Sequence, residues 1–390
     1  MLFIVVTRPS SNEYNGMLKY QISYILGGFV MTDINKLPLF FLSSNSAEGF
    51  VSHFGDSYSA SDGWRAYIIK GGPGTGKSTC MKAVAKKISE AGYDVHLAPC
   101  TGDPQSLDAV IVAELKTIIL DGTAPHVVEP KYIGACESLV DFGVSFDTEK
   151  LSDSRSEIIS LSNEMSELYE RAYRYIKAAG TLLTDTQRLV LQCTDTEKAK
   201  KFGTTIAERY IPKKAGKPSE KIRFLSGITS KGLVYYRSTI EKMGCNTISI
   251  CDEYGVASSI IMQRIHNIAL ERGQDIITCQ NPILPSKNMD HIILPKLGIA
   301  FITSNRYLSL GDVGHKIYAR RFTDAVALRL RKSKISFNRR AMNELIEKAA
   351  DTMAEAKSLH DELEKYYISS VDFAMINEIT ENLAHKIIGG

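Results

Sequence analysis

Short apolar runs alternate along the chain with longer stretches that carry apolar residues at helical spacing, which is the pattern of an α/β fold. The apolar run 66–69 precedes a glycine-rich segment, 70–76, and apolar residues then recur at helical spacing over 81–88. This order predicts a strand, a tight loop and a helix. The apolar runs 95–98 and 117–121 predict two further strands.

The same pattern occurs twice. Residues 39–51 align with 222–234, and farther on residues 107–121 align with 289–303. A shared period over several blocks indicates a duplicated domain, whereas the alternative is two unrelated α/β units with generic strand patterns. The aligned pairs of the first block are Phe41 with Phe224, Leu42 with Leu225, Ser43 with Ser226, Gly49 with Gly232, and Val51 with Val234.

Each copy is followed by a long helical pattern. Apolar residues keep helical spacing over 154–190 and again over 338–367, and a shorter helix follows each of them, ending near 210 and near 388. We expect antiparallel helical hairpins that pack on the sheet domains. These arms are predicted mainly as core-facing helices, with a lid as the alternative.

The predicted organisation follows from these patterns. Residues 1–30 fit no later pattern, which predicts a poorly ordered extension, and proline, glycine and lysine at 211–219 mark an exposed linker. The predicted parts are an N-terminal extension (1–36), a P-loop NTPase domain (37–148), a helical arm (149–211), a linker (212–221), a degenerate P-loop NTPase-like domain (222–336) and a second helical arm (337–390).

Composition narrows the class of protein. With 44% hydrophobic and 23% charged residues and a net charge of +3, the chain reads as an ordinary globular protein. Its seven cysteines include no C-x-x-C pair, which argues against a disulfide framework or a zinc site. No apolar run reaches membrane-spanning length. We expect a cytoplasmic protein with no membrane contact, and we expect the basic stretch 320–340 to be a solvated face and not a nucleic-acid site.

The glycine-rich loop matches a Walker A motif, G-x-x-x-x-G-K-[ST]. Its glycines let backbone N–H groups surround a phosphate, and the following helix directs its N-terminal amides at the same anion. We expect Lys77 to reach the β- and γ-phosphates of ATP and Ser78 to bind Mg²⁺. The predicted nucleotide-binding residues are Gly71, Gly72, Pro73, Gly74, Thr75, Gly76, Lys77, Ser78 and Thr79. The fold predicted on this basis is a duplication of P-loop NTPase-like parallel-sheet domains, each followed by a helical hairpin.

A Walker A loop needs an acid that holds Mg²⁺ at the end of a neighbouring strand. The run 117–121 ends in Asp121, which we predict to be this acid; the alternative is an Asp-Gly turn. A rival is Asp252-Glu253, which also follows an apolar run. The repeat instead makes that run the counterpart of the strand before the Walker A loop.

No glutamate follows Asp121, so the residue that polarises the attacking water must come from elsewhere. Asp103, Glu114 and His126 are the candidates, each of which can also be an ordinary polar loop residue. Asp103 follows the second predicted strand, where kinase-like P-loop proteins often carry an acid.

The second copy has a degenerate loop. The repeat sets Ala257 opposite Lys77 and Thr303 opposite Asp121, which removes the phosphate cation and the magnesium acid together. Asp252 and Glu253 would also repel a triphosphate. We therefore predict one working site, in the first copy.

These motifs carry a family resemblance. The segments 71–79, 106–108, 114–115 and 121–127 resemble an uncharacterised bacterial family of cytoplasmic P-loop ATPase-like proteins with two tandem NTPase-type halves. The similarity covers about residues 37–388, and Asp-Gly-Thr-Ala-Pro-His at 121–126 is its most specific part. The resemblance implies ATP binding and no particular substrate, and this chain departs from it in the loop of its second half.

The expected activity is Mg²⁺-dependent ATP hydrolysis at the first site. One alternative is a small-molecule or nucleotide kinase, with Asp103 as the base and a helical lid carrying Arg171 and Arg174. Another is a non-catalytic ATP-sensing module whose degenerate half recruits a partner.

Overall fold

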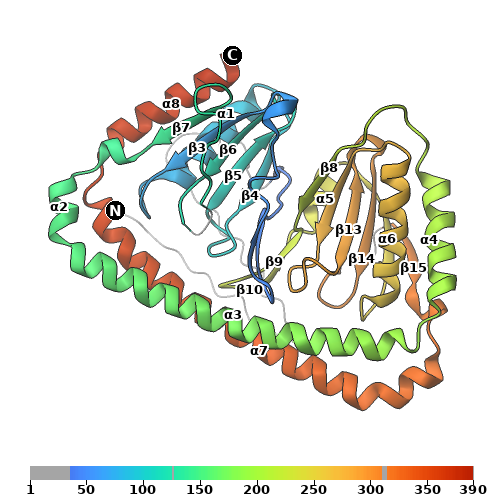
Figure 1. The fold of residues 1–390 in the computed structure, drawn as a ribbon. Coiled ribbons are helices and arrows are strands. Elements are labelled where there is room, and N and C mark those ends of the chain that lie inside the picture. Colours follow the sequence, from blue (N-terminus) through green and yellow to red (C-terminus); the bar gives the residue numbers. More distant parts are fainter. Residues whose placement is uncertain (1–35, 125–126, 310–313, 390) are drawn as a thin grey trace, which may run out of the picture. The chain divides into compact units, whose positions relative to one another are not determined.

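The structure is a computed structural model that describes residues 36–124, 127–309 and 314–389. The predicted N-terminal extension, apart from Lys36, lies outside the described residues. Residues 33–390 form one compact unit, in which two sheets are joined by long helices (Figure 1).

The first sheet has the strand order β4-β5-β6-β3-β7. The strand β3 (Arg65–Lys70) pairs in parallel with β6 (Thr117–Asp121) on one side and β7 (Glu137–Asp141) on the other. The strands β5 (Leu107–Val112) and β4 (His96–Pro99) extend the sheet beyond β6. Helix α1 (Lys77–Glu90) follows β3 and packs on β5 through apolar residues such as Met81 and Ile88.

The second sheet has the order β15-β11-β14-β13-β12-β8. Its central strand, β11 (Asn246–Cys251), pairs in parallel with β14 (Ile299–Ser304) and β15 (His315–Tyr318). Beyond β14 lie β13 (Met289–Leu294), β12 (Ile276–Gln280) and β8 (Glu220–Arg223). The helix α5 (Ser238–Lys242) precedes β11, and α6 (Val256–Glu271) follows it.

The two sheets repeat one topology down to its irregularities. Both contain a register shift on the strand after the central helix, between Ala98 and Pro99 and between Cys279 and Gln280. The place of β8 beside β12 is taken in the first sheet by a single parallel bridge between Leu39 and Leu97. The repeat seen in the sequence is therefore also a repeat of strand order and strand direction.

The expectation of parallel sheets is wrong in one respect, because both sheets are mixed. Strand β5 runs antiparallel to β4 and β6, and β13 runs antiparallel to β12 and β14. The reason is the short connection to the next strand, since only antiparallel neighbours can be joined by a tight turn. Each turn closes on a left-handed residue, Lys116 with φ 46° and Gly298 with φ 62°.

Two hairpins join the copies reciprocally. The hairpin β1–β2 (Ser43–Ser46, Gly49–Ser52) and the hairpin β9–β10 (Ser226–Thr229, Gly232–Tyr235) are equivalent in the repeat. Next to them, Phe41 N–H donates to the Phe224 carbonyl at 2.8 Å, and Phe224 N–H donates to the Phe41 carbonyl at 2.9 Å. Equivalent residues thus pair with each other, as at an interface with two-fold symmetry.

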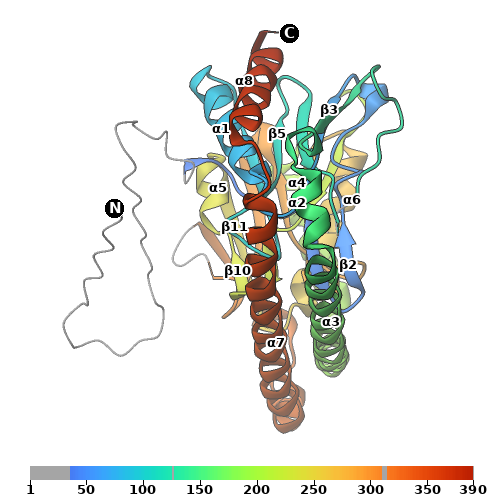
Figure 2. The same cartoon turned by 90° about the vertical axis from the view of Figure 1, so that its left-hand side faces the viewer.

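The long helices also pair reciprocally. After α2 (Thr148–Asp153), helix α3 (Arg155–Leu191) runs antiparallel to α7 (Ala325–Ile368), and the two lie side by side in both views (Figures 1 and 2). Ala172 and Ile176 of α3 form one buried cluster with Ala349 and Met353 of α7. The alanines at two of these positions, Ala172 and Ala349, let the helix axes approach closely.

The expectation that each helical arm forms an antiparallel hairpin is wrong. Helix α4 (Thr196–Tyr210), from the first arm, packs on α6 of the second copy, and α8 (Phe373–Gly389), from the second arm, packs on α1 of the first. Ile206 of α4 is buried in the core around α6, and Leu383 of α8 is buried in the core around α1. The arms therefore exchange partners, because each long helix carries the chain from one copy to the other.

Two boundaries also differ from the expectation. Helix α7 begins at Ala325 and not at 337, because the Asp324 side chain accepts hydrogen bonds from the N–H groups of Val326 and Ala327. The end of the predicted linker forms β8, which starts at Glu220. Among the described residues, no helix has the length and hydropathy needed to cross a membrane.

The exchanged helices give a testable pair of substitutions. Leu383→Ala and Ile206→Ala remove buried side chains, 5% and 7% exposed, from α8 and α4. Each should lower the free energy of unfolding by about 2–5 kcal/mol, the usual cost of truncating a buried aliphatic residue to alanine. Leu383→Ala should speed hydrogen exchange in α1, and Ile206→Ala should speed it in α6. Faster exchange in α6 for Leu383→Ala and in α1 for Ile206→Ala would instead show that each arm packs on its own copy.

Candidate functional site

The glycine-rich loop connects β3 to α1 at the carboxyl end of the first sheet. Gly76 is the N-cap of α1 and has a φ of 91°, a conformation that residues with a Cβ atom rarely adopt. Thr75, which is 1% exposed, donates its hydroxyl hydrogen to the Gly72 carbonyl at 2.8 Å. The loop is therefore held in shape by its own hydrogen bonds, and the first amides of α1 face the end of the sheet. Thr79 is exposed.

Lys77 and Asp121 meet beneath this loop. Asp121 is the last residue of β6, which is the direct neighbour of β3, and it stands opposite Ile69 in the ladder. Its Oδ2 lies 3.7 Å from Lys77 Nζ, and its Oδ1 accepts hydrogen bonds from the N–H (2.9 Å) and the hydroxyl (2.5 Å) of Thr123. Both side chains are largely buried, 11% and 14% exposed, so the pair is only weakly screened by water.

Further oxygen atoms lie near Asp121. The ladder between β5 and β6 pairs Ala109 with Leu120, which sets the buried Asp108 opposite Asp121 when the register is continued. The Ser78 hydroxyl accepts a hydrogen bond from Leu107 N–H at 2.9 Å, at the start of β5. Carboxylate and hydroxyl oxygens are the ligands that Mg²⁺ prefers, so this donor set fits that ion. Asp108 was not among the predicted site residues. The sequence indicates it through the repeat, which places a second aspartate, Asp290, at the equivalent position.

Asp103 lies in the loop between β4 and β5, on the same side of the sheet. Its carboxylate accepts hydrogen bonds from Gln105 N–H and from the Ser106 hydroxyl, and it lies 3.8 Å from the ammonium of Lys357. Because Lys357 belongs to α7, this ion pair links the loop to the second helical arm.

The end of α7 covers one side of the glycine-rich loop. A Cβ atom at Gly72 would lie 2.3 Å from the ring of Tyr367, and one at Gly74 would lie 2.9 Å from Glu364. These residues were missed in the sequence because nothing in it links the end of α7 to a loop so far away in the chain. In the sequence they belong to the polar face of a helix that was predicted from its apolar positions.

A histidine and two acids extend this face of α7. The ligand atoms of His360, Asp361 and Glu364 lie within 4.8 Å of one another, and Lys357 already pairs with Asp361. Burial lowers the pKa of His360, opposed by the nearby carboxylate of Glu364, and the positive charges of Lys357 and Lys77 lower it further. His360 is therefore biased toward its neutral form and lies within electrostatic reach of Lys77.

One predicted candidate, Glu114, is not brought to this site. Glu114 is exposed in the turn between β5 and β6, at the opposite end of β6 from Asp121, where its carboxylate accepts a hydrogen bond from Asp94 N–H at 3.4 Å. His126 lies outside the described residues. Of the three residues considered for polarising water, Asp103 is thus the one described near the loop.

In the second copy, a carboxylate of the protein itself lies at the N-terminus of the helix that follows the loop. Six residues, 71–76, connect β3 to α1, but only four, 252–255, connect β11 to α6. Asp252, which is 5% exposed, accepts hydrogen bonds from Ser258 N–H at 2.8 Å and from Tyr254 N–H at 3.1 Å. The N-terminal amides of α6 are therefore directed at a side chain of the protein itself.

The alignment of the two loops needs a correction of one position. Helix α1 begins with Lys77 after Gly76, and α6 begins with Val256 after Gly255, so Val256 and not Ala257 stands in the place of Lys77. The sequence alignment failed here because the two loops differ in length. The pairing of β11 with β14 sets Thr303 opposite Ile250, as Asp121 stands opposite Ile69, which agrees with the expected replacement.

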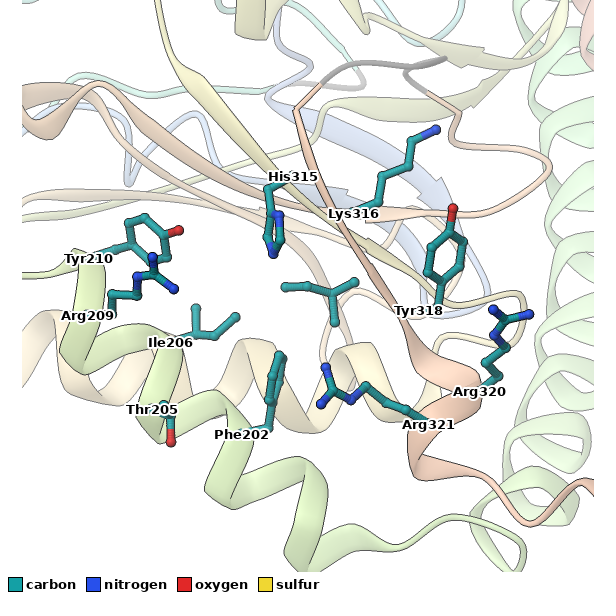
Figure 3. Close-up of a pocket in the computed structure, with 11 residues that line it drawn as sticks. Phe202, Thr205, Ile206, Arg209, Tyr210, His315, Lys316, Tyr318, Arg320 and Arg321 are labelled. Atoms are coloured by element: carbon teal, nitrogen blue, oxygen red, sulfur yellow. The ribbon is translucent and has the colours of Figure 1, made fainter.

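The first two arginines of the basic stretch, Arg320 and Arg321, lie beside α4 and the edge strand β15. They line a pocket of about 440 Å³ in which arginines rest on aromatic rings (Figure 3). The guanidinium of Arg321 lies 4.7 Å from the ring centre of Phe202, and that of Arg320 lies 5.2 Å from that of Tyr318. These arginines lie beside α4 and β15, so they do not complete the site around Lys77.

Comparison with protein-family models, with curated proteins and with solved structures gives no match. The resemblance to a tandem P-loop ATPase-like family therefore stays a prediction from the motif residues.

The contact between the loop and α7 is tested by Gly72→Ala. The added methyl group overlaps the ring of Tyr367, so this substitution should lower the free energy of unfolding by about 1–3 kcal/mol. Tyr367→Ala should remove most of this cost, which a double-mutant cycle by chemical denaturation would measure. Gly55→Ala is the matched control, because a Cβ atom there meets nothing within 4 Å. Additive effects at positions 72 and 367 would argue against the contact.

Proposed function

We propose that the first copy binds ATP with Mg²⁺ and hydrolyses it. The observation that carries this proposal is the approach of Lys77 Nζ to Asp121 Oδ2 at 3.7 Å, beneath a glycine-rich loop that opens a helix. A cation and a carboxylate so arranged provide the two charges that a magnesium–triphosphate complex requires.

The roles follow from the chemistry of each group. The amides of the loop and of the first turn of α1 bind the phosphate oxygens, and Lys77 balances the charge that develops on the β- and γ-phosphates. Ser78 and Asp121 hold Mg²⁺ directly or through water, with Asp108 beside them. The bound ion neutralises phosphate charge. Water attacks the γ-phosphorus, the bond to the β-phosphate oxygen breaks, and ADP and phosphate leave.

The position of Asp103 favours a kinase as the second candidate function. Its carboxylate lies in the loop after β4, at the same end of the sheet as Asp121, where it can accept a hydrogen bond from a substrate hydroxyl beside its ion pair with Lys357, 3.8 Å away. In that case the hydroxyl and not water attacks the γ-phosphate, and Asp103 accepts its proton. Arg171 and Arg174 of the expected lid are exposed on α3.

Substitution of Lys77 tests the site. Lys77→Ala should lower ATP turnover by about 100-fold or more, because it removes the charge that stabilises the transferring phosphoryl group. The control is Ser258→Ala in the first turn of α6 in the second copy, which should leave turnover unchanged. The measurement is phosphate release from ATP with Mg²⁺. Equal losses in the two variants would contradict a single site in the first copy.

The type of reaction is tested by the products and by the number of nucleotides bound. We expect phosphate release without any added acceptor, its loss with EDTA, and one nucleotide per chain by calorimetry of the wild-type protein. ADP formation only with an added acceptor would support the kinase, and tight binding without turnover would support a sensor. Absence of any ATP binding would overturn all three.

A further inference from the structure

The second copy contains a cavity where the first copy has its glycine-rich loop site. It has a volume of about 310 Å³ and lies at the carboxyl ends of β11 and β14, next to Gly255, the N-cap of α6. Helices α3 and α7 contribute the opposite wall, through Thr186 and Asn343 among others. This volume lies within the range of small-molecule pockets in proteins.

The cavity does not suit a phosphate. Asp252 already accepts hydrogen bonds from Ser258 N–H in the first turn of α6 and from Tyr254 N–H in the loop before it, and Val256 stands in the place of Lys77. Three carboxylic residues line the cavity, Glu253, Asp290 and Glu347, and one arginine, Arg339. Glu253 is paired with Arg306 and, at 3.8 Å, with Arg339, which leaves Asp290 and Glu347 as the lining acids without an ion pair in the described part of the chain. The excess of negative charge favours a cation over an anion.

Two buried polar groups in the wall have hydrogen-bonding capacity to spare. Thr303, which is 2% exposed, has a hydroxyl without a hydrogen-bond partner in the described part of the chain. Asp290, 8% exposed, accepts hydrogen bonds from one donor group described here, the side-chain amide of Asn281, at 3.0 and 3.3 Å. A buried polar group with unused hydrogen-bonding capacity is unfavourable, so a ligand that pairs with these groups is favoured.

These two groups face each other. The ladder between β13 and β14 pairs His291 with Ile302, and its continuation sets Asp290 directly opposite Thr303. Opposed residues on one face of an antiparallel pair have Cβ atoms about 5 Å apart, which one ammonium group can bridge. Burial raises the pKa of Asp290 to about 7, and a cation beside it would favour its charged form.

Part of the wall is apolar. It suits the hydrocarbon body of a ligand and is formed by residues from both long helices and from β9 and β10. These residues are Leu183, Ile228, Leu233, Ile335, Met342 and Ile346.

We propose that this cavity binds a small primary amine with an apolar body, its ammonium group held between the Asp290 carboxylate and the Thr303 hydroxyl. The site is separate from the ATP site proposed above and does not depend on it.

Three compounds that share one indole body provide the test: tryptamine, tryptophol and indole-3-propionate. Calorimetry on the full chain should show tryptamine binding once per chain, tryptophol at least about 10-fold more weakly, and no binding of the acid. A hydrogen bond to a charged group accounts for a difference of this size. Equal affinity for the amine and the alcohol, or tighter binding of the acid, would overturn the proposal.

Two variants locate the ammonium group. Thr303→Val removes only the hydroxyl and should weaken tryptamine binding about 10-fold, whereas Asp290→Asn keeps the shape of the side chain and should abolish it. Lys77→Ala is the control and should bind tryptamine like the wild type, which separates this result from any failure at the ATP site. Should Asp290→Asn fail to fold, Thr303→Val decides alone. Unchanged affinity in Thr303→Val would contradict the proposed position of the amine.

Discussion

The antiparallel packing of α3 against α7 is the constraint on which the rest of the structure depends. The contact is reciprocal, because Ala172 and Ile176 meet Ala349 and Met353 in one buried cluster. Each helix spans from its own sheet to the other, so the short helix that follows has to pack on the other copy. Burial of Ile206 and Leu383 in the opposite cores completes this exchange. Each fully buried aliphatic side chain contributes about 1.5–3 kcal/mol, which couples the folding of the two copies.

This exchange also determines the composition of the two sites. The end of α7 brings Lys357, Glu364 and Tyr367 to the glycine-rich loop of the first copy, although these residues follow the second sheet in the chain. The beginning of the same helix brings Arg339 and Asn343 to the cavity of the second copy. One helix therefore contributes side chains to both candidate sites, and neither site is complete within a single copy of the repeat.

The two copies differ most where a loop meets a helix. In the first, Lys77 and Asp121 form a buried pair of opposite charges beneath a six-residue loop. In the second, a loop of four residues brings Asp252 onto the amides of α6, so the protein supplies its own anion there. The buried acids Asp108 and Asp290 occupy equivalent strands in both. The same framework thus presents one site with cationic and acidic groups and one that is predominantly acidic.

The sequence by itself determined the order of strand, loop and helix around Lys77, the repeat, and the adjacency of Lys77 and Asp121, because these depend on local periodicity and on a motif with fixed spacing. It could not determine that β5 and β13 run antiparallel, since strand direction follows from pairing and not from hydrophobic pattern. The exchange of α4 and α8 and the approach of Tyr367 to Gly72 were likewise decided by the tertiary structure. An amphipathic helix specifies that one face is buried, but only the packing of the whole chain decides against which partner.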